Sequence, residues 1–401
     1  MIVAKVYSFV SANINQILLG IGALLVFLKK TLIKTRLGRI VDSKLRIGLN
    51  VVLSRVLFRP ESDTRHQKNY VFFLYGGIGD ITVDVSLIES YRKTRNLRCA
   101  VVFPRDYQQV FDSLGFGFES YTYSKHRILI DAIKLRKNLK GKNFILHHLS
   151  FETQVVAKLA GCNIVAGFYS DYQRIKLPNG TIRRLDYESY QRHMRVKKLL
   201  SITFGDLPTP DPKILIKKQV LALLLTKSGN KRASGTFELE TWMGIIAACI
   251  EADITKIILL GDSGGTEISD QIEKKVKGNT KLELENLVGK CSLSHSITQL
   301  KSSDLAVGLD SGLSHLASAL GIPILKLFYF SKPNDFVWGS NADFIFNPKI
   351  SCMPCVSESV EGIDNYPVIC KVGYKCTKSI NFGLAFEKTK DFLKKNEYLI
   401  S

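Results

Sequence analysis

Short apolar runs alternate with helical patterns along the chain from residue 70 onwards. The apolar runs predict strands at residues 70–75, 99–103, 143–147, 163–167, 219–226, 256–260, 305–309 and 324–328. Helices are predicted between them at residues 81–92, 106–114, 128–139, 152–160, 238–251 and 313–321. This alternation is typical of parallel sheets whose strands are joined by right-handed helical crossovers, so we expect an α/β protein.

A proline-rich stretch, residues 206–212, interrupts the alternation and lacks apolar periodicity, which favours a linker. At 401 residues the chain is long enough for two domains. We therefore predict a basic, apolar N-terminal segment (1–68), a Rossmann-like domain (69–205), a linker (206–216), a second Rossmann-like domain (217–383) and a C-terminal helix (384–401).

One strand-turn-helix-strand unit, residues 303–328, concentrates polar side chains where a strand ends and a helix begins. Asp310, Ser311, Ser314 and His315 lie at this point, whereas a structural turn needs a single capping residue. A helix start just beyond the carboxyl end of a parallel strand favours anions, phosphates above all. The alternative interpretation is an ordinary βαβ unit with a capped helix.

Residues 310–323, DSGLSHLASALGIP, resemble the D-[ST]-G-x-x-H-[LI]-A-x-A-L-G-x-P motif of the glycosyltransferase family 9 heptosyltransferases. The resemblance extends over residues 70–385. It implies the GT-B fold, in which two Rossmann-like domains face each other across a cleft and the C-terminal helix crosses back to the first domain. It also implies an inverting transferase that moves a sugar, heptose from ADP-heptose first of all, to a lipopolysaccharide core or lipid A-type acceptor.

A glycine-rich loop follows the first predicted strand and opens a helix. Its residues Gly76, Gly77 and Gly79 precede Asp80, and together they resemble the G-x-[IL]-G-D loop of the same family. The resemblance implies that Asp80 is the catalytic base and that the glycines form the loop on the acceptor side. Without it, Asp80 is equally well read as a helix cap.

The resemblance also implies a donor-binding set in the second domain. Lys231 and Arg232 match a phosphate-contacting basic position, and Glu267 matches an acid near the nucleotide ribose; the alternatives are a surface charge and a helix N-terminal acid. The whole predicted donor-binding set is Lys231, Arg232, Glu267, Asp310, Ser311, Gly312, Leu313 and His315.

Two positions depart from the family pattern. The proline usual in the helix after the glycine loop is absent from Val85-Ser86-Leu87. Tyr329 stands where a glycine is common, although Pro333 is retained. We expect Tyr329 to add bulk beside the donor site, so the identity of the sugar and of its nucleotide stays open.

The chain contains no D-x-D sequence of the kind that holds a diphosphate-bound metal, so we expect metal-independent transfer without a cofactor. Cationic side chains and a helix dipole would then stabilise the leaving diphosphate. Four cysteines, Cys352, Cys355, Cys370 and Cys376, have a spacing that is compatible with a structural zinc site. The other four are expected to be reduced core residues.

The net charge of +20 implies acidic partners. Residues 1–70 hold 12 Lys and Arg against three acids, and the apolar stretch 17–28 is shorter than the roughly 20 residues that usually span a bilayer. This favours a helix on the membrane surface; the alternatives are a membrane-spanning anchor and a helix packed on the protein. No nucleic-acid signature is present. We therefore expect a cytoplasmic protein that lies peripherally on the anionic inner face of the bacterial inner membrane, with a phosphorylated glycolipid as acceptor. The basic run 173–198 is either a solvated face or an acceptor surface.

Two other function classes remain open at this level. Gly261-Asp262-Ser263-Gly264-Gly265 fits the G-x-S-x-G pattern of a serine hydrolase, with Asp310 and His315 following in the right order. A non-catalytic module that binds a nucleotide or a glycolipid would also explain the phosphate-binding features.

Overall fold

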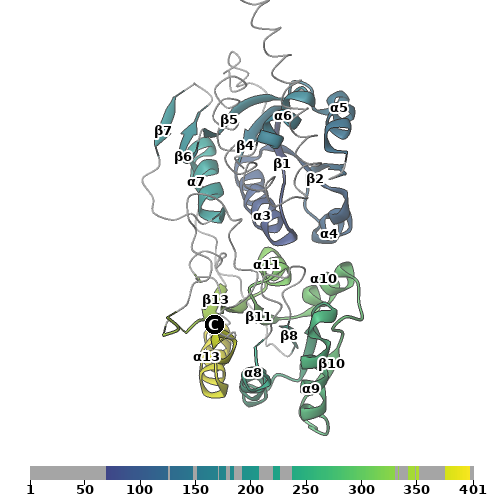
Figure 1. Cartoon of the computed structure of the whole chain (residues 1–401), viewed down its shortest axis with the longest axis vertical. Helices are drawn as coiled ribbons and strands as arrows, with labels where there is room; N and C mark the ends of the chain where they lie inside the picture. Colours follow the sequence, from purple (N-terminus) through teal and green to yellow (C-terminus); the bar gives the residue numbers. More distant parts are fainter. Residues whose placement is uncertain are drawn as a thin grey trace, which may run out of the picture.

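The computed structural model describes residues 69–124, 127–147, 151–169, 171–177, 181–184, 192–206, 220–225, 237–329, 333, 342–347, 349–351 and 375–397. They form two α/β lobes, seen one above the other in Figure 1, and each lobe is built on its own sheet. The predicted N-terminal segment (1–68) and most of the predicted linker (206–216) lie outside the described residues.

The first lobe contains a seven-stranded sheet in the order β3-β2-β1-β4-β5-β6-β7. Its strands are β1 (Asn69–Phe73), β2 (Arg98–Pro104), β3 (Glu119–Tyr123), β4 (Asn143–Leu146), β5 (Asn163–Tyr169), β6 (Asp171–Lys176) and β7 (Ile182–Arg184). Strands β1 to β5 pair in parallel, and β6 and β7 add an antiparallel edge.

Helices cover both faces of this sheet because successive side chains of a strand point to opposite faces. Phe72 of β1 and Leu74, which follows it, face one helical layer, while Val71 and Phe73 of β1 face the other. The first layer consists of α3 (Ile78–Arg95), α4 (Gln108–Leu114) and α7 (Arg192–Phe204). The second consists of α5 (Ile128–Leu139) and α6 (Phe151–Leu159).

The second lobe contains a six-stranded sheet, parallel throughout, in the order β10-β9-β8-β11-β12-β13. Its strands are β8 (Val220–Leu224), β9 (Lys256–Leu260), β10 (Glu283–Asn286), β11 (Leu305–Leu309), β12 (Ile324–Leu327) and β13 (Ala342–Ile345). The α-helices among its described residues are α8 (Leu239–Glu251), α9 (Thr266–Val276), α10 (Leu293–Ser302), α11 (Gly312–Ala319) and α13 (Phe382–Glu397).

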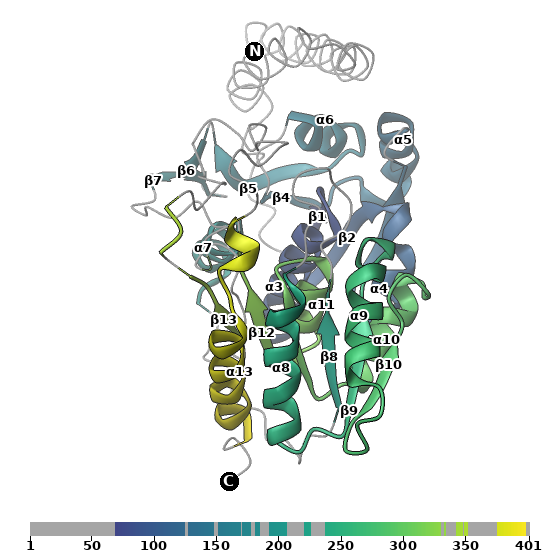
Figure 2. The same ribbon diagram turned by 60° about the horizontal axis from the view of Figure 1, so that its bottom comes forward.

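Helices α10 and α11 cover the face of the second sheet that meets the first lobe. Ile297 of α10 and Leu316 of α11 are buried in one apolar cluster with Val110 and Leu114 of α4. This cluster joins the two lobes, and Figure 2 shows α11 beside α3 and α10 beside α4. The sequence prediction of two Rossmann-like domains that face each other is therefore confirmed.

The opposite face of the second sheet carries α8, α9 and α13. Ala385, Phe392 and Leu393 of α13 are buried in the core that contains α8, and the Thr241 hydroxyl donates to the Ile380 carbonyl. The prediction that the C-terminal helix crosses back to the first domain is wrong for its described residues. The apolar face of α13 packs against α8, and the two helices lie side by side in Figure 1.

Several strands were not predicted from the sequence. Strands β3, β7, β10 and β13 lie at or next to sheet edges, and their short sequences hold too few apolar residues to form a continuous run. The basic run 173–198 contains parts of the β6–β7 hairpin and of α7, whose buried residues include Val196. Part of that run is therefore structural.

Candidate active site

The starts of helices α3 and α11 meet between the two lobes. A Cβ atom added at Gly312 would lie 2.6 Å from Cγ2 of Ile78, and one added at Gly79 would lie 2.8 Å from Cδ2 of His315. Both distances are shorter than a carbon–carbon contact allows, so the two glycines permit the close approach. The predicted loop and the predicted donor motif are thus brought together.

Sheet topology explains this position. The glycine loop follows β1, beside which the strand order of the first sheet reverses, and α11 follows β11, which pairs with β8 at the reversal in the second sheet. Ligands of open parallel α/β sheets bind outside the carboxyl ends of the strands at such reversals.

Asp80 lies in the first turn of α3 and its side chain is exposed. Its Oδ2 atom accepts a hydrogen bond of 3.1 Å from the backbone N–H of Gly77. Gly76 has a φ of +121°, which favours glycine, and a Cβ atom there would lie 2.8 Å from the same carboxylate oxygen. The loop therefore holds the Asp80 carboxylate at the helix start and leaves it open to solvent.

The first turn of α11 begins at Gly312. The hydroxyl of Ser314 accepts a 3.0 Å hydrogen bond from the backbone N–H of Ser311 and donates one of 2.8 Å to the Ser311 carbonyl. Leu313 is half-buried in this turn. Because Ser314 caps this end internally, the helix presents its positive dipole end beside the glycine loop, which suits an anionic group.

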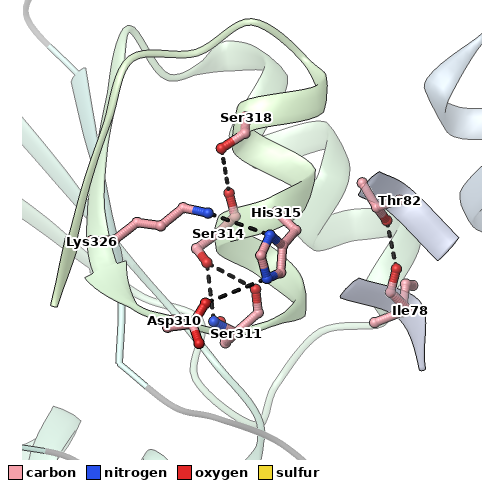
Figure 3. Close-up of polar contacts among 8 residues, drawn as sticks. All are labelled: Ile78, Thr82, Asp310, Ser311, Ser314, His315, Ser318 and Lys326. Atoms are coloured by element: carbon pink, nitrogen blue, oxygen red, sulfur yellow. Dashed lines mark hydrogen bonds and ion pairs between the residues drawn. The ribbon is translucent and has the colours of Figure 1, made fainter. Parts of the chain in front are cut away.

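His315 connects Asp310 with a lysine that the sequence analysis overlooked. Its Nε2 atom is 3.4 Å from Oδ1 of Asp310, and its Nδ1 atom is 3.3 Å from Nζ of Lys326 in β12 (Figure 3). All three residues are buried, and Lys326 is 0% exposed. A single lysine inside the apolar run Ile324–Leu327 was the available sequence signal.

Burial and neighbouring charges both shift the pKa values of Lys326 and His315. Burial lowers the pKa of Lys326 to about 8, against the attraction of Asp310. Burial also lowers the pKa of His315, and the positive charge of Lys326 lowers it further, while Asp310 and Asp80 oppose the change. Both cationic forms are therefore less favourable than in water.

The structure says less about the other predicted donor residues. Glu267 lies exposed in the first turn of α9, directly after the Gly261–Gly265 turn at the end of β9. Lys231 and Arg232 lie outside the described residues. Tyr329 is 2% exposed and its ring packs edge-on against Phe237 at 5.5 Å. It belongs to the core under α8, and its effect on the donor site stays a prediction.

The geometry does not support a Ser263 hydrolase. Both ring nitrogens of His315 lie beside other groups, Asp310 and Lys326. Ser263 follows β9, which is separated from β11 by β8. A catalytic triad requires one of these nitrogens to face the serine hydroxyl.

Within the described ranges, no group of three or more His, Cys, Asp or Glu side chains is arranged to hold a metal ion. Of the four cysteines considered for zinc, Cys376 is buried, and Cys352, Cys355 and Cys370 lie outside those ranges. No helix in the described part of the chain is long and apolar enough to cross a membrane.

Comparison with solved structures finds the same architecture. E. coli ADP-heptose lps heptosyltransferase II is 17% identical, with a TM-score of 0.56 over 82% of this chain and 99% of that one. A glycosyl transferase family 9 structure from Veillonella parvula is 15% identical, with a TM-score of 0.57 over 82% and 98%. E. coli heptosyltransferase WaaC with ADP is 15% identical, with a TM-score of 0.54 over 82% and 99%. No curated protein matches by sequence.

The family model described as glycosyltransferase family 9 (heptosyltransferase) matches residues 151–362, more than half of the chain. These residues include the Gly261–Gly265 turn, the Asp310–His315 cluster and Lys326. The solved structures add the GT-B arrangement of two facing sheets. The chain therefore belongs to glycosyltransferase family 9 and is a glycosyltransferase.

Proposed function

We propose that this protein is an inverting transferase that moves heptose from ADP-heptose to a phosphorylated lipopolysaccharide core or lipid A-type acceptor. The observation that carries the proposal is the meeting of the Asp80 loop with the start of α11 between the two lobes. A carboxylate that can take a proton and a helix end that can hold a diphosphate are the two groups that such a transfer requires.

In the proposed reaction, Asp80 accepts the proton of the acceptor hydroxyl. The acceptor oxygen then forms a bond to the anomeric carbon of the donor sugar, while the bond from that carbon to the diphosphate oxygen breaks. The nucleotide diphosphate leaves with the bonding electron pair. Attack and departure on opposite faces of the sugar invert its configuration.

The donor diphosphate is proposed to lie at the first turn of α11, where the helix dipole favours negative charge. Asp310 and His315 line the sugar side of this position, and Glu267 contacts the nucleotide ribose. Lys231 and Arg232 complete the site from the loop after β8, the strand that pairs with β11. Together these groups would stabilise the leaving diphosphate without a divalent metal.

A panel of nucleotide sugars tests the donor and the metal requirement together. With a lipid A-type acceptor, we expect ADP-heptose to give the highest rate of nucleotide diphosphate release. The rate is expected to be unchanged in EDTA, because the chain has no D-x-D sequence to hold a metal. A strict, reversible requirement for Mg²⁺ or Mn²⁺, or a clear preference for another donor, would contradict the corresponding part of the proposal.

We further propose that the protein binds the anionic membrane surface that carries its acceptor. Support within the described residues comes from α5, where Ile130 and Ile133 are 50% and 58% exposed. Exposed cations surround them, namely Arg127, Lys134, Arg136, Lys137 and Lys140. In both ribbon views α5 lies on the side of the first lobe away from the second sheet (Figures 1 and 2). Exposed apolar side chains among cations are typical of interfacial helices.

Vesicle sedimentation tests this surface. We expect the protein to bind vesicles that contain anionic lipid, and the binding to weaken as salt rises, because each basic residue near the surface contributes about 1 kcal/mol and is screened. Lys134→Glu with Lys137→Glu should reduce binding at least tenfold. The matched control changes Lys274 and Lys275, exposed on α9, in the same way. Equal loss in both variants would contradict a role of α5, and full-length protein that resists extraction by salt and by carbonate would contradict peripheral binding.

A further inference from the structure

Lys326 is a lysine buried in the interior of a parallel sheet. Ile324 and Lys326 point to the face covered by α10 and α11, while Leu325 and Leu327 belong to the core under α8 and α13. The lysine side chain therefore runs beneath α11 and ends at His315 (Figure 3). Its neighbours on the adjacent strands, Gly308 and Phe344, carry no charge.

The contact with Lys326 determines where His315 carries its proton. An ammonium group donates hydrogen bonds and cannot accept one, so Nδ1 of His315, 3.3 Å from Nζ, is the acceptor. The proton of the neutral ring then lies on Nε2, which is 3.4 Å from Oδ1 of Asp310. The ring is thus held in one tautomer by a donor on one side and an acceptor on the other.

This ring lies against the proposed catalytic loop. Its Cδ2 atom faces Gly79, the residue before Asp80, closely enough that no side chain fits between them. Asp80 also acts on the ring, because its negative charge raises the pKa of His315. A proton gained by His315 would place a positive charge beside Asp80, stabilise its carboxylate and weaken it as a base.

We propose that Lys326 is a positioning residue for the transfer reaction, which holds His315 as the neutral Nε2–H tautomer and so keeps a positive charge away from Asp80. The proposal rests on the proposed function only for its effect on turnover. Among the residues that the structure describes, the charged and titratable groups that act on the pair include Asp310 at the end of β11 and Asp80 at the start of α3, besides the two residues themselves.

Stability alone does not explain a lysine at this position. Its pKa in the folded protein, about 8, is below the ordinary value of 10.5. The protonated form therefore destabilises the fold below pH 8, and this effect disappears as the pH rises from 8 to 10.5. A methionine of similar length would fill the same space without the charge. We expect Lys326→Met to raise the Tm at pH 7, which a lysine needed for packing would not do.

The titration of His315 gives the direct test. The protein has seven histidines, which can be labelled with ¹³C at Cε1 and followed one by one by NMR; the His315 signal is the one lost in His315→Gln. We expect the pKa of His315 to rise in Lys326→Met, because the charge that lowers it is removed, and to stay near the wild-type value in Lys326→Arg. The other six signals serve as internal controls. Should Lys326→Met fail to fold, Lys326→Gln removes the same charge.

Turnover measured across pH gives the second readout. With the raised pKa, Lys326→Met is expected to lose several-fold in kcat at pH 6 relative to the wild type, and little at pH 8.5, where most of the charge of Lys326 is lost in the wild type as well. An unchanged His315 titration, or a loss of kcat that is the same at every pH, would overturn the proposal. If no nucleotide sugar is turned over, the proposed function fails, while the NMR titration still decides the role of Lys326.

Discussion

Asp80→Asn is expected to reduce turnover by about 10²–10⁴-fold, the usual contribution of a positioned general base. Asparagine keeps an oxygen that can accept the 3.1 Å hydrogen bond from Gly77 N–H, so the loop should keep its conformation. It cannot accept the acceptor's proton. Binding of the nucleotide donor should therefore stay close to that of the wild type, while kcat falls. Single-turnover kinetics and calorimetric titration with the nucleotide separate the two effects.

The matched control for this variant is Asp391→Asn. Asp391 is an exposed carboxylate on α13, on the face of the second lobe away from the first, and its removal changes the net charge by the same amount. We expect it to leave kcat unchanged. If Asp80→Asn also turned over within a few-fold of the wild type, Asp80 would be no more than the cap of α3, as the alternative interpretation of the loop holds.

Gly312→Ala is expected to lower kcat/KM by roughly tenfold to a hundredfold, which corresponds to an overpacking cost of about 1–3 kcal/mol. The added Cβ would lie 2.6 Å from Cγ2 of Ile78, so the starts of α3 and α11 would have to move apart. The clash lies between the lobes and not inside either core. We therefore expect a small change in Tm and a large change in activity.

A second substitution, at Ile78, should restore the activity that Gly312→Ala loses, because Ile78 supplies the atom that the added Cβ would meet. Ile78→Ala removes Cγ2, so Ile78→Ala combined with Gly312→Ala should recover most of the lost kcat/KM, giving a coupling energy between the two positions. Gly383→Ala is the control, since its added Cβ has nothing nearer than 3.9 Å and the residue is exposed on α13. A double variant no more active than Gly312→Ala would show that the approach of the two helix starts does not limit the reaction.

The sequence predicted the central elements well because they are determined locally. The strands 256–260 and 305–309 and the helix 128–139 have the predicted bounds. A buried parallel strand needs a continuous apolar run, and an amphipathic helix needs apolar residues every three or four positions, so both can be recognised from neighbours a few residues apart. The motif at 310–323 identified the family for the same reason.

The sequence predicted helix ends, edge strands and the packing of the C-terminal helix less well. Helix α3 begins at Ile78, three residues before its predicted start, because the Asp80 carboxylate accepts from the N–H of Gly77 and so lies inside the first turn. Strand β10 was not predicted, since the side chains of Glu283–Asn286 are mostly polar at a sheet edge. The path of α13 was predicted from the family resemblance, yet the helix packs on α8 of its own lobe.

Only the tertiary structure decided how the site is assembled. Gly79 and His315, or Ile78 and Gly312, are far apart in sequence, and nothing in the local pattern of either segment shows that they touch. The contact between Lys326 and His315 likewise depends on which face of β12 points to α11. Such contacts follow from the packing of whole sheets and helices against one another. The sequence by itself therefore determined the central elements, most of the candidate chemical groups and the family, and the packing of the two lobes decided which of those groups meet.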